Sequence, residues 1–218
     1  MAIQDDGREN EIRELFKLTK VGGRGDVDAI LTLDGKKYDF ELKSTTKNSV
    51  STVRDLGPDH ILKWRKMHWI VGVYNPAGSK LLDCYYASPA QMKTWVDEIA
   101  GYIDPDFKLA EVVPELIGAK EMVAVLGNKA KYTLEDAQGL QKAQHTKAEY
   151  LSMMDVAGGY SPKRMLEILK SRCKYVIERG STLNNPHISL SYFKKCDQIG
   201  SNHAARLRDL VKKSVAGK

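Results

Sequence analysis

The feature that most constrains the fold is an Asp-Gly dipeptide, Asp34-Gly35, between two runs of alternating apolar and polar residues. Asp-Gly tolerates the positive φ angles of a type I′ turn, so residues 26–43 are predicted to form a β-hairpin with a two-residue loop. A loop of this length fixes which residues of the two strands lie opposite one another. The hairpin therefore predicts that Asp28 faces Glu41.

Strand side chains alternate between the two faces of a sheet, so the predicted hairpin has one apolar and one charged face. The apolar face is expected to join the core and carries Val27, Ala29, Leu31, Leu33, Phe40 and Leu42. The other face carries Asp26, Asp28, Ile30, Asp39, Glu41 and Lys43. On that face Asp26 is predicted to lie opposite Lys43.

Opposed strand residues have Cβ atoms about 5 Å apart, and two carboxylates at that separation repel each other unless a cation lies between them. Mg²⁺ prefers carboxylate oxygens and keeps several waters, so Asp28 and Glu41 are predicted to hold one such ion. Lys43 lies one pleat further along the same face. Its ammonium is expected to hold an attacking water and to offset charge that grows on a phosphate. Asp26 remains an alternative acidic ligand.

Two simpler interpretations compete with this hypothesis. The tripeptide Glu-x-Lys arises by chance roughly once in a chain of this length. A strand face with mixed charges is also most often only solvated. The hypothesis of a catalytic site therefore depends on the hairpin register and not on the tripeptide.

Composition adds a weaker indication of the partner. Lys and Arg total 34 against 28 Asp and Glu, which gives a net charge of +6 and suits a polyanion such as nucleic acid. The three cysteines are far apart and form no Cys-x-x-Cys pair, which argues against a disulfide framework and a zinc site. There is no leader of charged then apolar residues and no run of 18 apolar residues, so we expect a cytoplasmic protein without a membrane partner.

The order of predicted elements favours an α/β fold. A helix is predicted over residues 9–18, with an apolar stripe that lies on the sheet. A second helix begins at Pro58, buried strands follow over residues 69–74 and 81–86, and Ser88-Pro89 begins another helix.

Residues 104–180 are predicted to be mainly helical. Thr133 and Asp136 form a capping signature for a helix that reaches Met154, and Ser161-Pro162 begins another that ends at Gly180. A small strand pair is expected earlier, from residues 112–114 and 122–126. A last basic helix is predicted over residues 201–215.

Asp28 and Glu41-Leu42-Lys43, with the strands around them, resemble the active site of the PD-(D/E)xK nuclease superfamily. Residues 38–74 resemble Type II restriction endonucleases of that superfamily in particular. The resemblance follows Tyr-x-x-Glu-Leu-Lys-Ser, a polar segment, the helix at Pro58 and Trp69-Ile70-x-x-x-Tyr74. A second match, Asn184-Asn185-Pro186-His187-Ile188, comes later in the expected order.

The resemblance implies a restriction-endonuclease-like fold, in which a mixed β-sheet core is flanked by helices and carries a mainly helical insertion. Residues 1–103 would be the catalytic core, 104–180 the insertion, and 181–218 a recognition strand and C-terminal helix that complete the core. The implied protein is a Type II restriction endonuclease of prokaryotic or viral origin. It would act as a homodimer and cut double-stranded DNA at a short palindrome by Mg²⁺-dependent hydrolysis, with Asp28, Glu41 and the Leu42 carbonyl as metal ligands.

The resemblance also implies that two segments enter the major groove together. Their candidate recognition residues are Ser51, Arg54, Asp55, Asn184, Asn185 and His187. Weaker candidates for phosphate contact are Arg24, Trp64, Lys163 and Arg164. The alternatives are an Arg54–Asp55 or turn contact, an Asn-Asn-Pro that only makes a turn, core packing for Trp64, and a solvated basic helix.

The chain departs from the restriction-enzyme pattern in three ways. No proline precedes Asp28, Arg54 and Asp55 replace a pair of recognition histidines, and residues 104–179 have no visible counterpart. Two other functions therefore stay open. One is a repair or junction-resolving nuclease of the same superfamily that reads DNA structure. The other is a DNA-binding module without catalysis.

Overall fold

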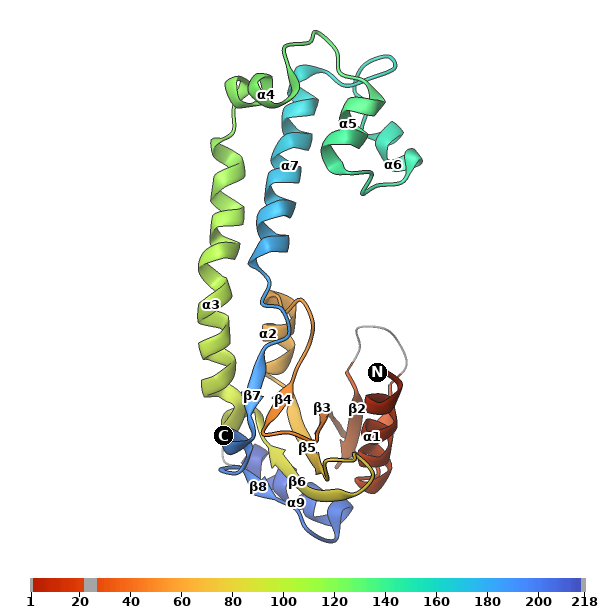
Figure 1. Ribbon diagram of the computed structural model, residues 1–218, viewed down its shortest axis with the longest axis vertical. Helices are drawn as coiled ribbons and strands as arrows, with labels where there is room; N and C mark the ends of the chain where they lie inside the picture. Colours follow the sequence, from red (N-terminus) through yellow and green to blue (C-terminus); the bar gives the residue numbers. More distant parts are fainter. Residues whose placement is uncertain (1, 22–26, 217–218) are drawn as a thin grey trace. The chain divides into compact units, whose positions relative to one another are not determined.

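The computed structural model describes residues 2–21 and 27–216, and Figure 1 shows the elements in chain order. The chain divides into two compact units, Met1–Tyr102 with Leu183–Lys218, and Ile103–Thr182. The boundaries expected from the sequence, after residues 103 and 180, lie next to these. The first unit contains a mixed sheet with helices, so the expectation of a mixed α/β fold is confirmed.

The predicted hairpin is strands β2 (Ala29–Leu33) and β3 (Lys36–Thr45). Asp34 and Gly35 have φ angles of 51° and 75°, which are the two positive values that a type I′ turn requires. The antiparallel ladder pairs Ala29 with Phe40 and continues to the turn in the predicted register. Ala29, Leu31, Phe40 and Leu42 are buried, so the apolar face joins the core as expected.

The hairpin is part of a sheet with strand order β1-β2-β3-β5-β6-β8. Strands β3 and β5 (His68–Tyr74) are parallel, and helix α2 (Pro58–Trp64) lies between them in the chain. The other pairs are antiparallel and involve β1 (Thr19–Lys20), β6 (Leu81–Ala87) and β8 (Asp197–Gln198). Strand β3 extends five residues beyond Phe40, its last residue paired with β2, so among the described residues no strand pairs with this edge from Glu41 onward.

Helices α1 (Ala2–Leu15) and α9 (His203–Ala216) pack on one face of this sheet. Ile12, Phe16 and Leu207 are fully buried in the cluster that they form with the apolar face of the hairpin. A Cβ on Gly72 of β5 would lie 2.7 Å from Ile12 Cδ1. Glycine at this position therefore allows α1 to lie close to the strands.

The opposite face is covered by an aromatic cluster. Trp69 of β5 contacts Trp64 of α2, Trp95 of α3 (Pro89–Leu116) and Phe193 of α8 (Leu190–Phe193), with ring centroids 5.1, 6.1 and 6.5 Å apart. Trp64 is only 2% exposed. The expectation that Trp64 contacts a phosphate is therefore wrong, because its ring is part of the core.

A separate two-stranded sheet joins two segments that are far apart in sequence. Strands β4 (Ser49–Ser51) and β7 (His187–Ser189) are antiparallel, with Ser51 opposite His187. A further bridge pairs Leu56 with Leu183. The structure thus places the two candidate recognition segments side by side.

The second unit is helical and contains the end of α3 with α4 (Ala119–Leu126), α5 (Leu134–Gln141), α6 (Lys147–Ser152) and α7 (Pro162–Ser181). Its core is built around three buried tyrosines and Met165; the tyrosines are Tyr132, Tyr150 and Tyr160. In the described part of the chain, no helix is long and apolar enough to cross a membrane.

Two local predictions for this unit are wrong. The expected strand pair at 112–114 and 122–126 is helical, because the apolar residues there are spaced for helix packing and Met122 is buried in the tyrosine core. The helix expected from Thr133 to Met154 is two helices. Lys142 and Ala143, with φ angles of 54° and 51°, end α5, and a second capping box at Thr146 begins α6.

Candidate active site

Three of the predicted residues meet at the open edge of β3. The Lys43 ammonium nitrogen lies 2.7 Å from Glu41 Oε1, 3.4 Å from Asp28 Oδ2 and 3.1 Å from the carbonyl oxygen of Leu42. These are the three oxygen donors that the sequence predicted as metal ligands. They converge on one position, which the lysine ammonium fills.

Asp28 reaches this position because it lies one residue before β2 begins. The amide of Leu42 donates a 2.8 Å hydrogen bond to Asp28 Oδ2, so the carboxylate satisfies a donor on the open edge of β3 where the ladder has ended. The bond fixes the carboxylate against Glu41 and Lys43. Asp28 and Glu41 therefore come together, although the paired ladder stops at Ala29.

The environment of Lys43 keeps its side chain charged. Burial alone lowers the pKa of Lys43, but the nearby carboxylates of Glu41, Asp28 and Glu9 raise it, and the net result is a pKa well above the ordinary value. Only 14% of the Lys43 side chain and 12% of that of Glu41 are exposed. Because the folded-state pKa is raised, the stabilisation from Lys43 is complete at neutral pH and is lost only as the pH rises above the unfolded value of 10.5.

The donor set fits a hard divalent cation. Two carboxylates and one main-chain carbonyl are oxygen ligands of the kind that Mg²⁺ takes, and Mg²⁺ keeps further positions for water or a phosphate oxygen. Within residues 2–21 and 27–216, no group of three or more His, Cys, Asp or Glu side chains has the arrangement of a metal site. An ion here would therefore displace the Lys43 ammonium from the position that it fills, and would depend on the Leu42 carbonyl and on ligands from the substrate or solvent.

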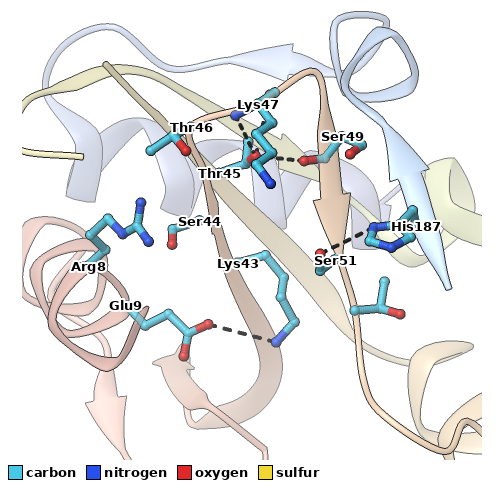
Figure 2. Close-up of a pocket in the computed structure, with 11 residues that line it drawn as sticks. Arg8, Glu9, Lys43, Ser44, Thr45, Thr46, Lys47, Ser49, Ser51 and His187 are labelled. Carbon is cyan, nitrogen blue, oxygen red and sulfur yellow. Dashed lines mark hydrogen bonds and ion pairs between the residues drawn. The ribbon is translucent and has the colours of Figure 1, made fainter. Parts of the chain in front are cut away.

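Glu9 is a functional candidate that the sequence analysis missed. Its Oε1 atom lies 3.9 Å from Lys43 Nζ, and Figure 2 shows the two side chains approaching from α1 and β3. Glu9 precedes Ile12 and Phe16 at helical spacing, so it continues the buried stripe of α1 toward the end of the hairpin. This helical spacing of Glu9 with Ile12 and Phe16 was the signal in the sequence that could have identified Glu9.

On the hypothesis of a phosphodiester-cleaving site, Glu9→Gln is expected to slow cleavage by about tenfold without abolishing it, because Glu9 helps to hold the Lys43 ammonium but is not one of its closest partners. Single-turnover rates, with the melting temperature as a check on folding, test this prediction. Glu14→Gln, an exposed change on the same helix, is the matched control. A wild-type rate for Glu9→Gln would remove Glu9 from the site.

The candidate recognition residues lie on and beside the β4–β7 sheet. Ser51 Oγ is 3.2 Å from His187 Nδ1, and Asn184, Asn185 and Arg54 are exposed. Thr52 is tied to Pro186 by two hydrogen bonds, from its amide at 3.1 Å and its hydroxyl at 2.7 Å. Asp55 and Asn185 have φ angles of 58° and 57°, so each also shapes a turn.

The remaining predicted residues lie outside the described residues or in the second unit. Arg24 and Asp26 lie outside the described residues. Lys163 and Arg164 are at the start of α7 in the second unit, where Arg164 pairs with Glu167 at 2.6 Å. Lys170 similarly pairs with Glu115 at 2.8 Å, so ion pairs neutralise part of the basic surface of α7.

Comparison with known proteins gives no family for the chain: neither a protein-family model nor a curated protein matches it.

Proposed function

We propose that this protein is a Mg²⁺-dependent endonuclease that cleaves double-stranded DNA, and more specifically a Type II restriction endonuclease. The observation that carries the proposal is the convergence of Asp28, Glu41 and the Leu42 carbonyl on the Lys43 ammonium. A mixed sheet with helices on both faces, and with these residues at the open end of a hairpin, also suits the restriction-endonuclease-like fold that the sequence resemblance implies.

Each residue has a role that follows from its chemistry. Asp28, Glu41 and the Leu42 carbonyl would hold Mg²⁺, which when bound polarises a phosphoryl oxygen and lowers the pKa of a bound water. The Lys43 ammonium would present a positive charge to the phosphate and a hydrogen-bond donor to the attacking water. The hydrogen bond from the Leu42 amide keeps Asp28 in place.

Site specificity is proposed for the β4–β7 sheet and its flanking turns. Amide, imidazole and guanidinium groups can read base edges in the major groove, and this sheet places Ser51 and His187 together with Asn184, Asn185 and Arg54 nearby. The net charge of +6 supports association with DNA but gives no sequence preference.

Arg54→Ala is expected to weaken binding to the cognate sequence by about 1 to 3 kcal/mol and binding to random DNA much less, because a guanidinium that pairs with guanine contributes to discrimination. Competition binding with both DNAs measures the difference. An equal loss of affinity for the cognate and the random DNA would show that Arg54 contacts a phosphate and reads no base.

A homodimer is part of the same proposal, because a palindromic site is read by two copies related by a twofold axis. The end of α3 carries Leu109, Val112 and Leu116 on one exposed face. Exposed apolar side chains at such spacing are typical of a protein interface.

We expect the double substitution Leu109→Glu and Leu116→Glu to shift the protein to monomers, measured by sedimentation velocity across a range of concentrations. Unchanged association would place the interface elsewhere.

Digestion of plasmid DNA in Mg²⁺ followed by sequencing of the fragment ends tests the proposed function. Identical ends at a short symmetric sequence are the expected result. Cutting confined to branched DNA would instead identify a structure-specific nuclease. A DNA complex that is never cut in Mg²⁺ or Mn²⁺ would identify a binding module.

A further inference from the structure

A hollow of about 410 Å³ lies beside the candidate active site. Figure 2 shows Arg8 and Glu9 entering it from α1 on one side and Ser51 and His187 from β4 and β7 on the other, with the end of β3 between them. Lys43 is part of its lining, so the hollow and the candidate active site are continuous.

The lining of the hollow favours an anion. Its lining includes three cationic side chains, those of Arg8, Lys43 and Lys47, and the carboxylate of Glu9. The Lys43 charge is already shared with the carboxylates of Glu41, Asp28 and Glu9, so Lys47 and Arg8 are the cations that the hollow adds. Six hydroxyl groups also line it, those of Ser44, Thr45, Thr46, Ser49, Ser51 and Thr52. The hydroxyls of Thr45 and Thr52 already donate to main-chain carbonyls, and that of Ser51 is paired with His187. Lys47 is exposed and has no ion-pair partner among the described residues. Cations with many short donors around a wide, open space suit a phosphate group.

Ser44 gives independent support for a ligand. Its Oγ atom is buried and has no hydrogen-bond partner among the described residues, whereas the hydroxyl of Thr45 donates to the carbonyl of Ser49 at 2.6 Å. A buried hydroxyl without a hydrogen-bond partner costs free energy, which indicates that a bound group supplies the missing partner. Amides of alternate strand residues point to the same edge of a strand. The Ser44 amide therefore faces the same edge of β3 as the Leu42 amide, which donates to Asp28.

We propose that the hollow binds a backbone phosphate of the DNA, next to the phosphate at Lys43. The inference rests on the proposed function, because it assigns the hollow to the same substrate. Lys47 and Arg8 supply the charge, and the Ser44 hydroxyl and amide supply directed hydrogen bonds. The site would fix the position of the DNA strand and read no base, since it offers donors suited to phosphate oxygens.

Salt-dependent binding of a short duplex, measured by fluorescence anisotropy without divalent ions, tests the site separately from cleavage. A lysine that contacts a phosphate contributes about 0.9 to the slope of log K against log salt, so Lys47→Gln should reduce the slope by about that amount. Ser44→Ala should weaken binding by about 3- to 10-fold with no change in slope, because it removes an uncharged donor. Lys80→Gln, an exposed change in the β5–β6 turn, should change neither quantity.

Duplexes with a single methylphosphonate then locate the contact. Wild-type protein should lose affinity when one particular backbone position is neutralised, and Lys47→Gln should be insensitive at that position. If the protein binds DNA in this way but never cuts it, the phosphate site stands and the proposed nuclease function fails. The inference is overturned if the protein cuts DNA but neither variant changes binding. In that case Lys47→Gln would keep the wild-type slope of log K against log salt, and Ser44→Ala would keep the wild-type affinity.

Discussion

Lys43→Met is expected to abolish cleavage, with a loss of at least about 1000-fold, while DNA binding stays within a few-fold of wild type. In the proposed mechanism the Lys43 ammonium compensates charge that develops only as the phosphodiester breaks. Single-turnover cleavage in Mg²⁺ and anisotropy without Mg²⁺ measure the two quantities.

Lys80→Met is the matched control, because Lys80 is an exposed lysine in a turn of the same unit. It should cut DNA at the wild-type rate. Substantial cutting by Lys43→Met would exclude the lysine from the mechanism. A parallel loss of binding and cleavage would instead mean that Lys43 holds the DNA in its ground state.

Asp28→Asn is expected to reduce cleavage by about 100- to 1000-fold, because a metal ligand contributes several kcal/mol to stabilising the transition state. Asparagine keeps an oxygen that can accept the hydrogen bond from the Leu42 amide, so the fold around β3 should be retained. Cleavage rates over a range of Mg²⁺ concentrations, with melting temperatures beside them, measure the effect.

Two other carboxylates make this comparison specific. Asp39→Asn changes an exposed acid on the charged face of β3 and should be nearly silent. Asp26→Asn should also be active if Asp28 is the principal ligand. An inactive Asp26→Asn beside an active Asp28→Asn would show that the predicted assignment of the acids is wrong.

The hairpin and the grouping of Asp28, Glu41 and Lys43 were predictable from sequence because one local signal determined them. A two-residue Asp34-Gly35 turn fixes the register, and the register places Asp28 near Glu41 and Lys43. The helix cap at Ser161-Pro162 and the buried strand at 69–74 were equally local, and both are present in the structure.

Other parts of the site depend on contacts between distant segments, which no short pattern encodes. The pairing of β4 with β7 joins Ser51 to His187 through backbone bonds between residues more than a hundred positions apart. Glu9 reaches Lys43 only because α1 packs on the sheet, with Gly72 allowing the close approach. Residues 112–114 are helical because they continue the long helix α3, although β-branched residues such as Val112 and Val113 favour strand locally.

The central claim is that Asp28, Glu41 and Lys43 act as one catalytic unit. The most direct test compares plasmid cleavage rates in Mg²⁺ for Asp28→Asn, Glu41→Gln, Lys43→Met and the triple variant, each with an intact fold and DNA binding. Residues that act as a unit are strongly non-additive. Each single variant is therefore expected to be nearly as inactive as the triple variant. A single variant that cuts at the wild-type rate, or a triple variant that still cuts, would contradict it.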